Sequence, residues 1–407
     1  MDQGASSASN FAVAFLIAHS STAHLLGTFA VVQTTYVLTQ SIVRSLTSDC
    51  LLTRRDSDEV MPRYESAGFL SAFCCALVAA VVLLGVGAAF SSDLRVTFIT
   101  LAVAFPLLAC QDFARYIGIT RYNPLYAVWL DTAWLVLFLV AYVVLRERGF
   151  VSMPWIFGEW SATGALVGLY ALWNHLVIRN QRNLIAFWAR SERAVAFRFA
   201  GESLLQNAWT YVAVYLLIVI FSLSEVGEIK LAQLVIAPTI VVLSGISTSM
   251  VAVASRYFAT DAKKALRFVI GVAIAIAAVC LLWTLAVYSV PTATMTKLLG
   301  PAWPNARQLV PLTGIGMAAM GFGGMLGAGL RSMRAAKKTF RLSLASLPSV
   351  FVLSLGGGVI WGVRAALAGA AIGYAVFAVA ALVLLIQTAH RFDPSVESVP
   401  FADAAQA

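Results

Sequence analysis

The most informative side chains of this sequence are carboxylates that fall inside long apolar runs. Asp131 stands about eight residues into the run 123–145, which places it roughly 12 Å along a helix. An ionised Asp at that depth costs about 2.5–3.5 kcal/mol to insert into a bilayer, so it is expected to face a partner or water. It would either contact a substrate or carry a proton, or form a structural hydrogen bond between neighbouring helices.

A second polar group lies in the run 199–222. Glu202, Gln206 and Trp209 are spaced i, i+4 and i+7, which puts them on one helical face, with Asn207 beside them. A carboxylate, two amides and an indole ring suit a sugar, because polar groups bond hydroxyls while the ring covers an apolar sugar face. The alternative is that Glu202 pairs with Arg198 one turn away.

Two glutamines and three arginines complete the candidate binding residues. Gln33 and Gln233 would line a cavity from opposite halves of the chain, or form hydrogen bonds between helices, which is the more common use. Arg44, Arg115 and Arg331 stand at span ends, where a guanidinium can bond a diphosphate headgroup bidentately. Alternatively, they are topological charges whose side chains reach the lipid headgroups.

The elements that must position these residues are membrane spans. Hydrophobic residues make up 60% of the 407 residues and charged residues 12%, against about 45–50% and 25% in a soluble protein. Runs of about 20 apolar residues are long enough to cross a bilayer. The sequence therefore predicts an all-α, polytopic membrane protein of about twelve spans: 9–23, 25–47, 66–90, 94–116, 123–145, 160–178, 199–222, 229–255, 266–290, 305–330, 339–362 and 365–389.

The basic residues predict the orientation of these spans. With the N-terminus inside, 21 of the 28 Lys and Arg residues fall on the cytoplasmic side, as the positive-inside rule requires. The remaining seven are Arg95, Arg146, Arg148, Lys230, Lys297, Arg307 and Arg364. Both termini are therefore expected in the cytoplasm and the protein in the cytoplasmic membrane.

The stretch 179–198 divides the chain into halves. It carries five arginines against one acid, with apolar residues at roughly helical spacing, which is typical of an interfacial amphipathic helix; an ordinary basic loop is the alternative. The predicted organisation is an N-terminal lobe at 1–178, a cytoplasmic linker at 179–198, a C-terminal lobe at 199–390 and a disordered tail at 391–407.

Two local matches suggest that the halves are repeats, as in many secondary transporters. Gly27–Gln33 and Gly227–Gln233 share the pattern Gly-x5-Gln at the start of the second span of each half. Basic residues six apart also follow the fourth and tenth spans, at Arg115 and Arg121 and at Arg331 and Lys337.

Other chemistries find little support. The sequence has no HExxH, Walker A or CxxC motif, so no metal site, cofactor or disulfide is expected. The glycines within 321–329 lie in an apolar span, where they indicate close helix packing. The acids expected on the outer side form no catalytic pair of the kind a lipid-linked glycosyltransferase needs. These acids are Asp93, Glu147, Glu159, Glu225 and Glu228.

Four segments resemble the multidrug/oligosaccharidyl-lipid/polysaccharide exporter superfamily, and within it the polysaccharide exporters and O-antigen flippases. They are LLGTFAVVQTTYVLTQSIVRSL at 25–46, QDFARYIGITRYNPLYAVWLDTAWL at 111–135, LLGPAWPNARQLVPL at 298–312 and GAGLRSMRAAKK at 327–338. The resemblance implies two six-helix lobes around a central cavity that opens alternately to each side, and it implies no enzyme activity.

The resemblance also implies a function, a flippase or exporter of lipid-linked oligosaccharide or polysaccharide. Its expected partners are membrane lipids, the lipid-linked glycan and polysaccharide biosynthesis enzymes, with no nucleic acid, and the protein is expected to be a monomer. A cation-coupled multidrug antiporter of the same superfamily is the first alternative. An integral-membrane glycosyltransferase or polymerase and a membrane scaffold are the others.

Overall fold

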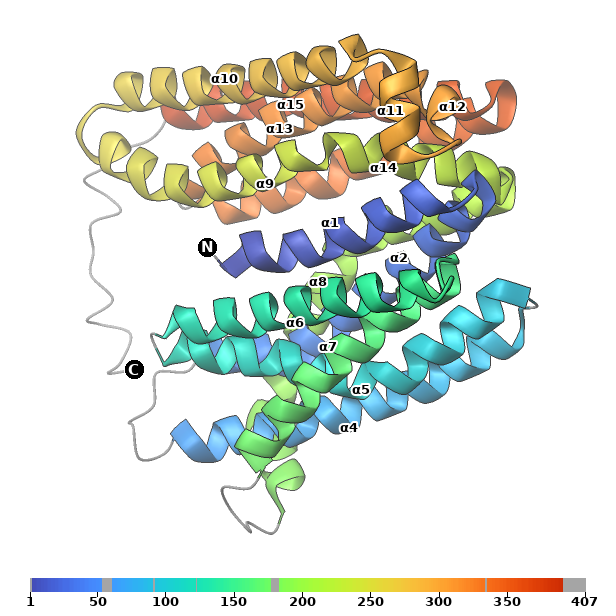
Figure 1. Cartoon of the computed structure of the whole chain (residues 1–407). Helices are drawn as coiled ribbons and strands as arrows, with labels where there is room; N and C mark the ends of the chain where they lie inside the picture. The colour runs from blue at the N-terminus through green and yellow to red at the C-terminus, as the bar shows by residue number, and fades with distance from the viewer. Residues whose placement is uncertain are drawn as a thin grey trace. The chain divides into compact units, whose positions relative to one another are not determined.

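The computed structural model describes residues 2–52, 61–90, 92–121, 123–176, 183–333 and 335–390. Within these ranges every regular element is a helix (Figure 1). The long helices are α1 (Asp2–Ser20), α2 (Ala23–Leu46), α4 (Met61–Ala88), α5 (Ser92–Thr120), α6 (Pro124–Glu147), α7 (Met153–Leu176), α8 (Leu184–Ile220), α9 (Leu223–Thr260), α10 (Ala262–Ser289), α13 (Val310–Ser332), α14 (Ala336–Trp361) and α15 (Val363–His390). Three short helices connect them: α3 (Ser48–Leu52), α11 (Thr292–Leu299) and α12 (Trp303–Arg307).

The long helices of the described chain correspond one to one with the predicted spans. Seven of them, α4, α5, α6, α10, α13, α14 and α15, have both the length and the apolar composition needed to cross a membrane. α2 carries more polar residues, with three threonines between Gln33 and Gln40. The prediction of a polytopic all-α membrane protein is confirmed.

The chain forms two compact units, of which the first contains Met1–Leu231 and Met295–Trp303. Its core is rich in aromatic rings, and Phe29, Phe69, Phe105, Phe113 and Trp160 are each less than 2% exposed. The rings come from α2, α4, α5 and α7, so these four helices share one core.

The second unit contains Ala232–Thr294 and Pro304–Ala407. In its core, α13 packs against α10 and α15 through small residues. A side chain at Gly323 would approach Phe377, and one at Gly329 would approach Val269. The predicted role of this glycine cluster in close helix packing is therefore confirmed. At the start of α10, Asp261 Oδ1 accepts hydrogen bonds from the backbone N–H groups of Lys263 and Lys264 at 2.9 and 3.0 Å, and the bonds to these N–H groups lower the pKa of Asp261.

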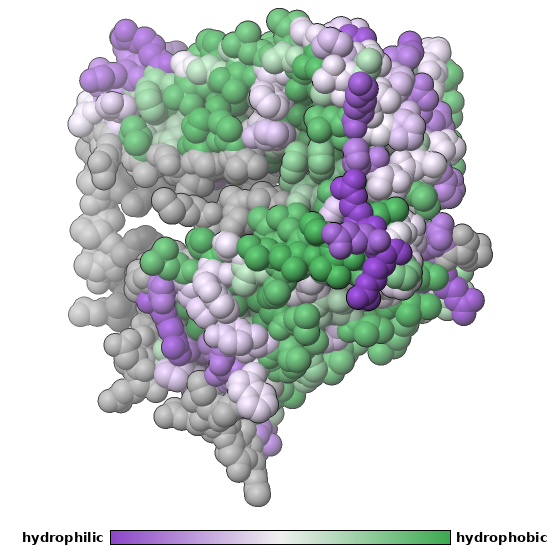
Figure 2. All heavy atoms as spheres, viewed as in Figure 1, coloured by the Kyte–Doolittle hydropathy of each residue, from purple (hydrophilic) through white to green (hydrophobic). Residues whose placement is uncertain are grey.

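Large apolar side chains cover much of the outer surface of the helices, as Figure 2 shows in green. On α4, Val78, Val81 and Val82 are more than 60% exposed, and on α5 Val103 is 73% exposed. In water, a protein with such a surface would tend to aggregate, whereas in a membrane lipid chains solvate the surface.

Most of the predicted linker, residues 184–198, belongs to α8. This helix begins at Leu184 and runs without a break through Arg198 to Ile220. Its buried stripe, formed by Leu184, Trp188, Glu192, Ala196 and Ala200, repeats every four residues and packs on α2 and α4. Residues 177–182, which hold the first part of the linker, lie outside the described residues.

Candidate functional site

Four charged side chains form a continuous cluster inside the first unit. The Arg44 guanidinium of α2 donates from Nε and Nη2 to the two oxygens of Asp112 on α5, at 3.0 and 2.6 Å. Arg115, one turn further along α5, lies 3.3 Å from Asp112 Oδ1 and 3.1 Å from Asp131 Oδ2 on α6. Asp131 Oδ1 also accepts a hydrogen bond from Gln111 Nε2 at 2.9 Å. The cluster therefore joins three helices.

The cluster is buried, except at Arg44. The side chains of Asp131, Asp112 and Arg115 are 1%, 5% and 10% exposed, whereas that of Arg44 is 34% exposed. Two guanidinium groups and two carboxylates also balance in formal charge. Burial of single charges would cost several kcal/mol each, so the neutral arrangement is what allows them to remain inside apolar helices.

The charged residues of the cluster lie close to the ends of their helices. Asp112 lies eight residues before the end of α5 and Asp131 seven residues after the start of α6, or roughly 12 and 10 Å from these ends. Arg44 is two residues before the end of α2. All three lie near the helix ends for which the distribution of basic residues predicts the cytoplasmic side. Asp49 of α3 lies beyond the end of α2, and burial raises its pKa.

A layer of aromatic rings packs next to the cluster. Tyr36, two turns before Arg44 on α2, contacts the Trp160 ring edge-on at 5.3 Å between centroids. Trp134, on the same helix as Asp131, donates its indole N–H to the Trp160 backbone oxygen at 2.8 Å. Trp160 in turn donates its indole N–H to Ser9 Oγ at 3.0 Å. These contacts link α2, α6 and α7.

Glu159 differs from the prediction made for it. It was expected in an outer loop, but it lies inside α7, 6% exposed. Neither carboxylate oxygen has a hydrogen-bond partner among the described residues. An unpartnered buried carboxylate is costly when ionised, so Glu159 is better accommodated with a proton or a bound cation.

Glu65 is also inside a helix rather than before it. Its carboxylate is 4% exposed and accepts from Arg121 Nε at 2.8 Å, and from Arg121 Nη2 as well. Asp131 and Glu202 are therefore not the only acids within the long helices. Asp112, Glu65 and Glu159 also lie in long helices.

The structure brings three of the predicted site residues together: Arg44, Arg115 and Asp131. Gln33 lies on the same helix as Arg44, about three turns away, and its Oε1 is buried without a hydrogen-bond partner. Arg331, in the last turn of α13, and Gln233, on α9, are exposed. The side chains of Glu202, Gln206, Asn207 and Trp209 lie outside the described part, although α8 passes through all four positions.

Asp112 and Gln111 are the members of the cluster that the sequence prediction missed. The signal was available, because Asp112 and Arg115 stand three residues apart inside an apolar run, and that spacing brings side chains together on a helix. Among the described residues, no group of three or more His, Cys, Asp or Glu side chains is placed to hold a metal ion.

The two glycines of the predicted repeat meet in the first unit. A β-carbon at Gly27 would overlap the backbone oxygen of Leu223, and one at Gly227 would overlap the backbone oxygen of Ala23. Each glycine thus contacts the residue four positions before the other. This reciprocal contact has the form that a two-fold relation between α2 and α9 would give, which supports the repeat.

Comparison with known proteins gives no match to a family model or to a curated sequence. The structure, however, is similar to that of an inward-facing multidrug resistance MATE family transporter of the MOP superfamily, with a TM-score of 0.71 and 13% identity over 97% of this chain and 96% of that one. The lipid II flippase MurJ, in an inward closed conformation, gives a TM-score of 0.71 and 11% identity over 95% of this chain and 87% of that one. The chain has the MOP exporter fold.

A Vibrio cholerae MATE transporter, VcmN, extends the comparison. It matches with a TM-score of 0.61 and 13% identity over 97% of this chain and 95% of that one. The resemblance predicted from the four sequence segments is confirmed at the level of the fold. Because the shared fold covers nearly the whole chain, the charged cluster and Glu159 lie within it.

Proposed function

We propose that this protein is a membrane transporter that flips or exports a lipid-linked oligosaccharide or polysaccharide by alternating access. The observation that carries the proposal is the MOP exporter fold, shared over nearly the entire chain with a lipid II flippase and with MATE transporters. A transporter, rather than an enzyme, also agrees with the lack of a paired acidic motif among the acids expected on the outer side.

Arg44 is the residue that we propose for contact with the diphosphate headgroup. Its guanidinium is fixed by two bonds to Asp112 while a third of its side chain stays exposed. Such an arginine is already oriented, so binding a phosphate costs little side-chain entropy. Arg115 is buried between two carboxylates, and we assign it a structural role. The polar positions of α8, Glu202 to Trp209, remain proposed contacts for the sugar.

The second candidate function is a cation-coupled multidrug antiporter. Glu159 favours it, because a buried carboxylate without a hydrogen-bond partner can take up and release a proton or cation. The same group would equally serve a flippase driven by an ion gradient. Identifying the transported substrate therefore distinguishes a flippase from an antiporter better than testing for coupling to an ion gradient does.

The remaining proposals concern the setting of the protein. We place it in the cytoplasmic membrane with both termini inside, because of the distribution of basic residues. Two six-helix lobes, divided within 179–198, remain our proposal for the moving parts. Polysaccharide biosynthesis enzymes are the proposed protein partners, and the transporter is proposed to act as a monomer.

The decisive experiment compares lipid-linked glycans in cells with and without the gene. Mass spectrometry of lipid extracts is expected to show a lipid-linked glycan that accumulates in the deletion strain and disappears on complementation. Complementation with Arg44→Gln should leave most of the accumulation in place, whereas Arg146→Gln, an exposed arginine near the end of α6, should clear it. No accumulation, together with loss of drug resistance, would instead establish the antiporter.

A further inference from the structure

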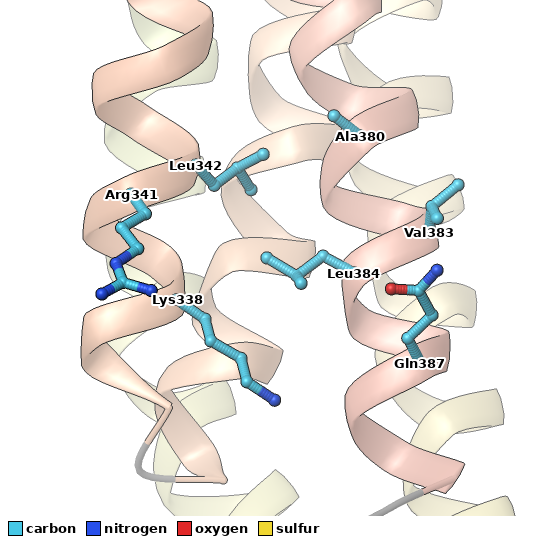
Figure 3. A pocket seen from close by; sticks show the side chains of 7 residues that line it. All are labelled: Lys338, Arg341, Leu342, Ala380, Val383, Leu384 and Gln387. Carbon is cyan, nitrogen blue, oxygen red and sulfur yellow. The ribbon is translucent and has the colours of Figure 1, made fainter.

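An open pocket of about 560 Å³ lies between α14 and α15 in the second unit. Its lining combines two basic side chains with an apolar bed, as Figure 3 shows. Lys338 and Arg341 come from α14, and Leu342, Ala380, Val383, Leu384 and Gln387 form the rest. The basic residues belong to the first two turns of α14. On α15, Ala380, Val383 and Leu384 lie six to ten residues before the end of the helix.

The apolar part of this pocket has the reach of a lipid chain. Ala380 is ten residues before the end of α15 at His390, or about 15 Å at 1.5 Å per residue. Val383 is exposed and Leu384 half-buried, so the bed faces outward rather than into the core of the unit. An acyl chain can therefore lie along it while its headgroup stays at the helix end.

Among the described residues, neither Lys338 nor Arg341 forms an ion pair. Between 232–294 and 304–390 the sequence holds eleven Lys and Arg residues but one acid, Asp261, and Asp261 caps α10. Lys338 donates a hydrogen bond to Thr388 Oγ1 at 3.2 Å, which anchors its amine between the two helices. Lys338 and Arg341 stand three residues apart, on one face of α14. A negatively charged group in the pocket would complement both of them.

We propose that the α14–α15 pocket binds one anionic membrane phospholipid, with its phosphate against Lys338 and Arg341 and an acyl chain along Leu342, Ala380, Val383 and Leu384. Charge complementarity selects an anionic headgroup, and the apolar bed selects a lipid over a free anion. The site is independent of the cluster around Asp112 and does not depend on the transported substrate.

The test titrates purified, delipidated full-length protein with phosphatidylglycerol or phosphatidylcholine of the same acyl chains, and counts bound lipids by native mass spectrometry. Phosphatidylglycerol is expected to fill one high-affinity site. The double variant Lys338→Gln, Arg341→Gln should weaken it roughly 25-fold, about fivefold for each cation. Val383→Trp, which fills the apolar bed from an exposed position, should weaken both lipids without removing a charge.

The matched control is the double variant Lys263→Gln, Arg267→Gln. It removes two exposed cations from α10 in the same unit, outside the pocket, and is expected to bind like the wild type. The proposal is overturned if this control loses as much affinity as the pocket variant, because the attraction is then diffuse. It is also overturned if phosphatidylcholine binds equally well, or if millimolar inorganic phosphate displaces phosphatidylglycerol, which would mean that a free anion is the ligand.

Discussion

Removing one charge from the cluster of Arg44, Asp112, Arg115 and Asp131 leaves a buried partner without compensation. The cluster is neutral and nearly closed to solvent at three of its four members. This arrangement agrees with the structural alternative for Asp131, a link between helices of one unit. Exposure at Arg44 is the feature that allows the cluster to take part in binding as well.

Asp131→Asn is therefore expected to destabilise the protein by about 3–5 kcal/mol, because Arg115 stays buried and charged. The measurement is the melting temperature and the amount of membrane-inserted protein, followed by fluorescence-detected gel filtration. Glu147→Gln, at the exposed end of the same helix, is the control and should behave like the wild type. Normal abundance and melting of Asp131→Asn with lost transport would restore a direct functional role.

Glu159→Gln is expected to behave in the opposite way. Since neither oxygen of Glu159 has a hydrogen-bond partner among the described residues, removing its charge should leave the melting temperature unchanged or higher. Transport driven by an ion gradient should fall strongly. The assay is substrate uptake into proteoliposomes with and without an imposed pH or sodium gradient. Gradient-driven transport at the wild-type rate would exclude Glu159 as the coupling group.

At the scale of helices, the contact between α2 and the start of α9 depends on glycine. Gly27→Ala is expected to cost roughly 1–3 kcal/mol of stability, because the added methyl group overlaps the Leu223 carbonyl oxygen. Gly85→Ala in α4 is the matched control, since its methyl group would meet nothing within 4 Å and alanine favours a helix. Thermal unfolding of both variants in detergent measures the difference; equal melting would mean that the two helices separate freely at this point.

The helices themselves were predictable from sequence, because hydropathy reports the length of each apolar run directly. Their ends were less so: α7 begins at Met153, seven residues before the predicted span, and that error placed Glu159 in an outer loop. The arginines of 179–198 predict a linker separate from the next span, whereas the structure has one continuous helix, α8. Its buried stripe from Leu184 to Ala200 is visible only once α2 and α4 are packed against it.

The site was predictable only in part, because the sequence shows single polar residues but not which helices bring them together. Single polar residues in apolar runs, such as Asp131, are conspicuous in the sequence. Their pairing is a property of three helices meeting, and Asp112 could not be matched to Arg44, 68 residues away, without the fold. The reciprocal contact of Gly27 and Gly227 shows the same limit, since the repeat predicts their equivalence but not their contact.

At the scale of the whole molecule, the charges are divided very unequally. Fifteen of the 19 acids lie within residues 1–231, while 232–294 and 304–390 contain one. The eleven basic residues of the latter ranges therefore face a single acid, and only the tail 391–407 adds three more acids. In the proposed orientation, nine of these basic residues lie on the cytoplasmic side.

This orientation predicts the outcome of cysteine labelling in intact cells. In a background lacking the five native cysteines, a cysteine at position 147 should react with a membrane-impermeant maleimide. A cysteine at position 263 should react only after the membrane is opened. Both native side chains, Glu147 and Lys263, are exposed, so access depends on the side of the membrane. Labelling at 263 in sealed cells would invert the proposed topology.

The scarcity of acids in the helices and loops of the second unit also bears on how the chain enters the membrane. A cell that is negative inside retains each cation there with about 2.3 kcal/mol per 100 mV, and acids in the same loops would cancel that pull. In the loops up to residue 390, nine cytoplasmic cations face one acid, Asp261, so that pull is almost uncancelled there. Biogenesis of this half is thus tied to the energised state of the cell, and chains synthesised while the membrane is depolarised should insert it in mixed orientations.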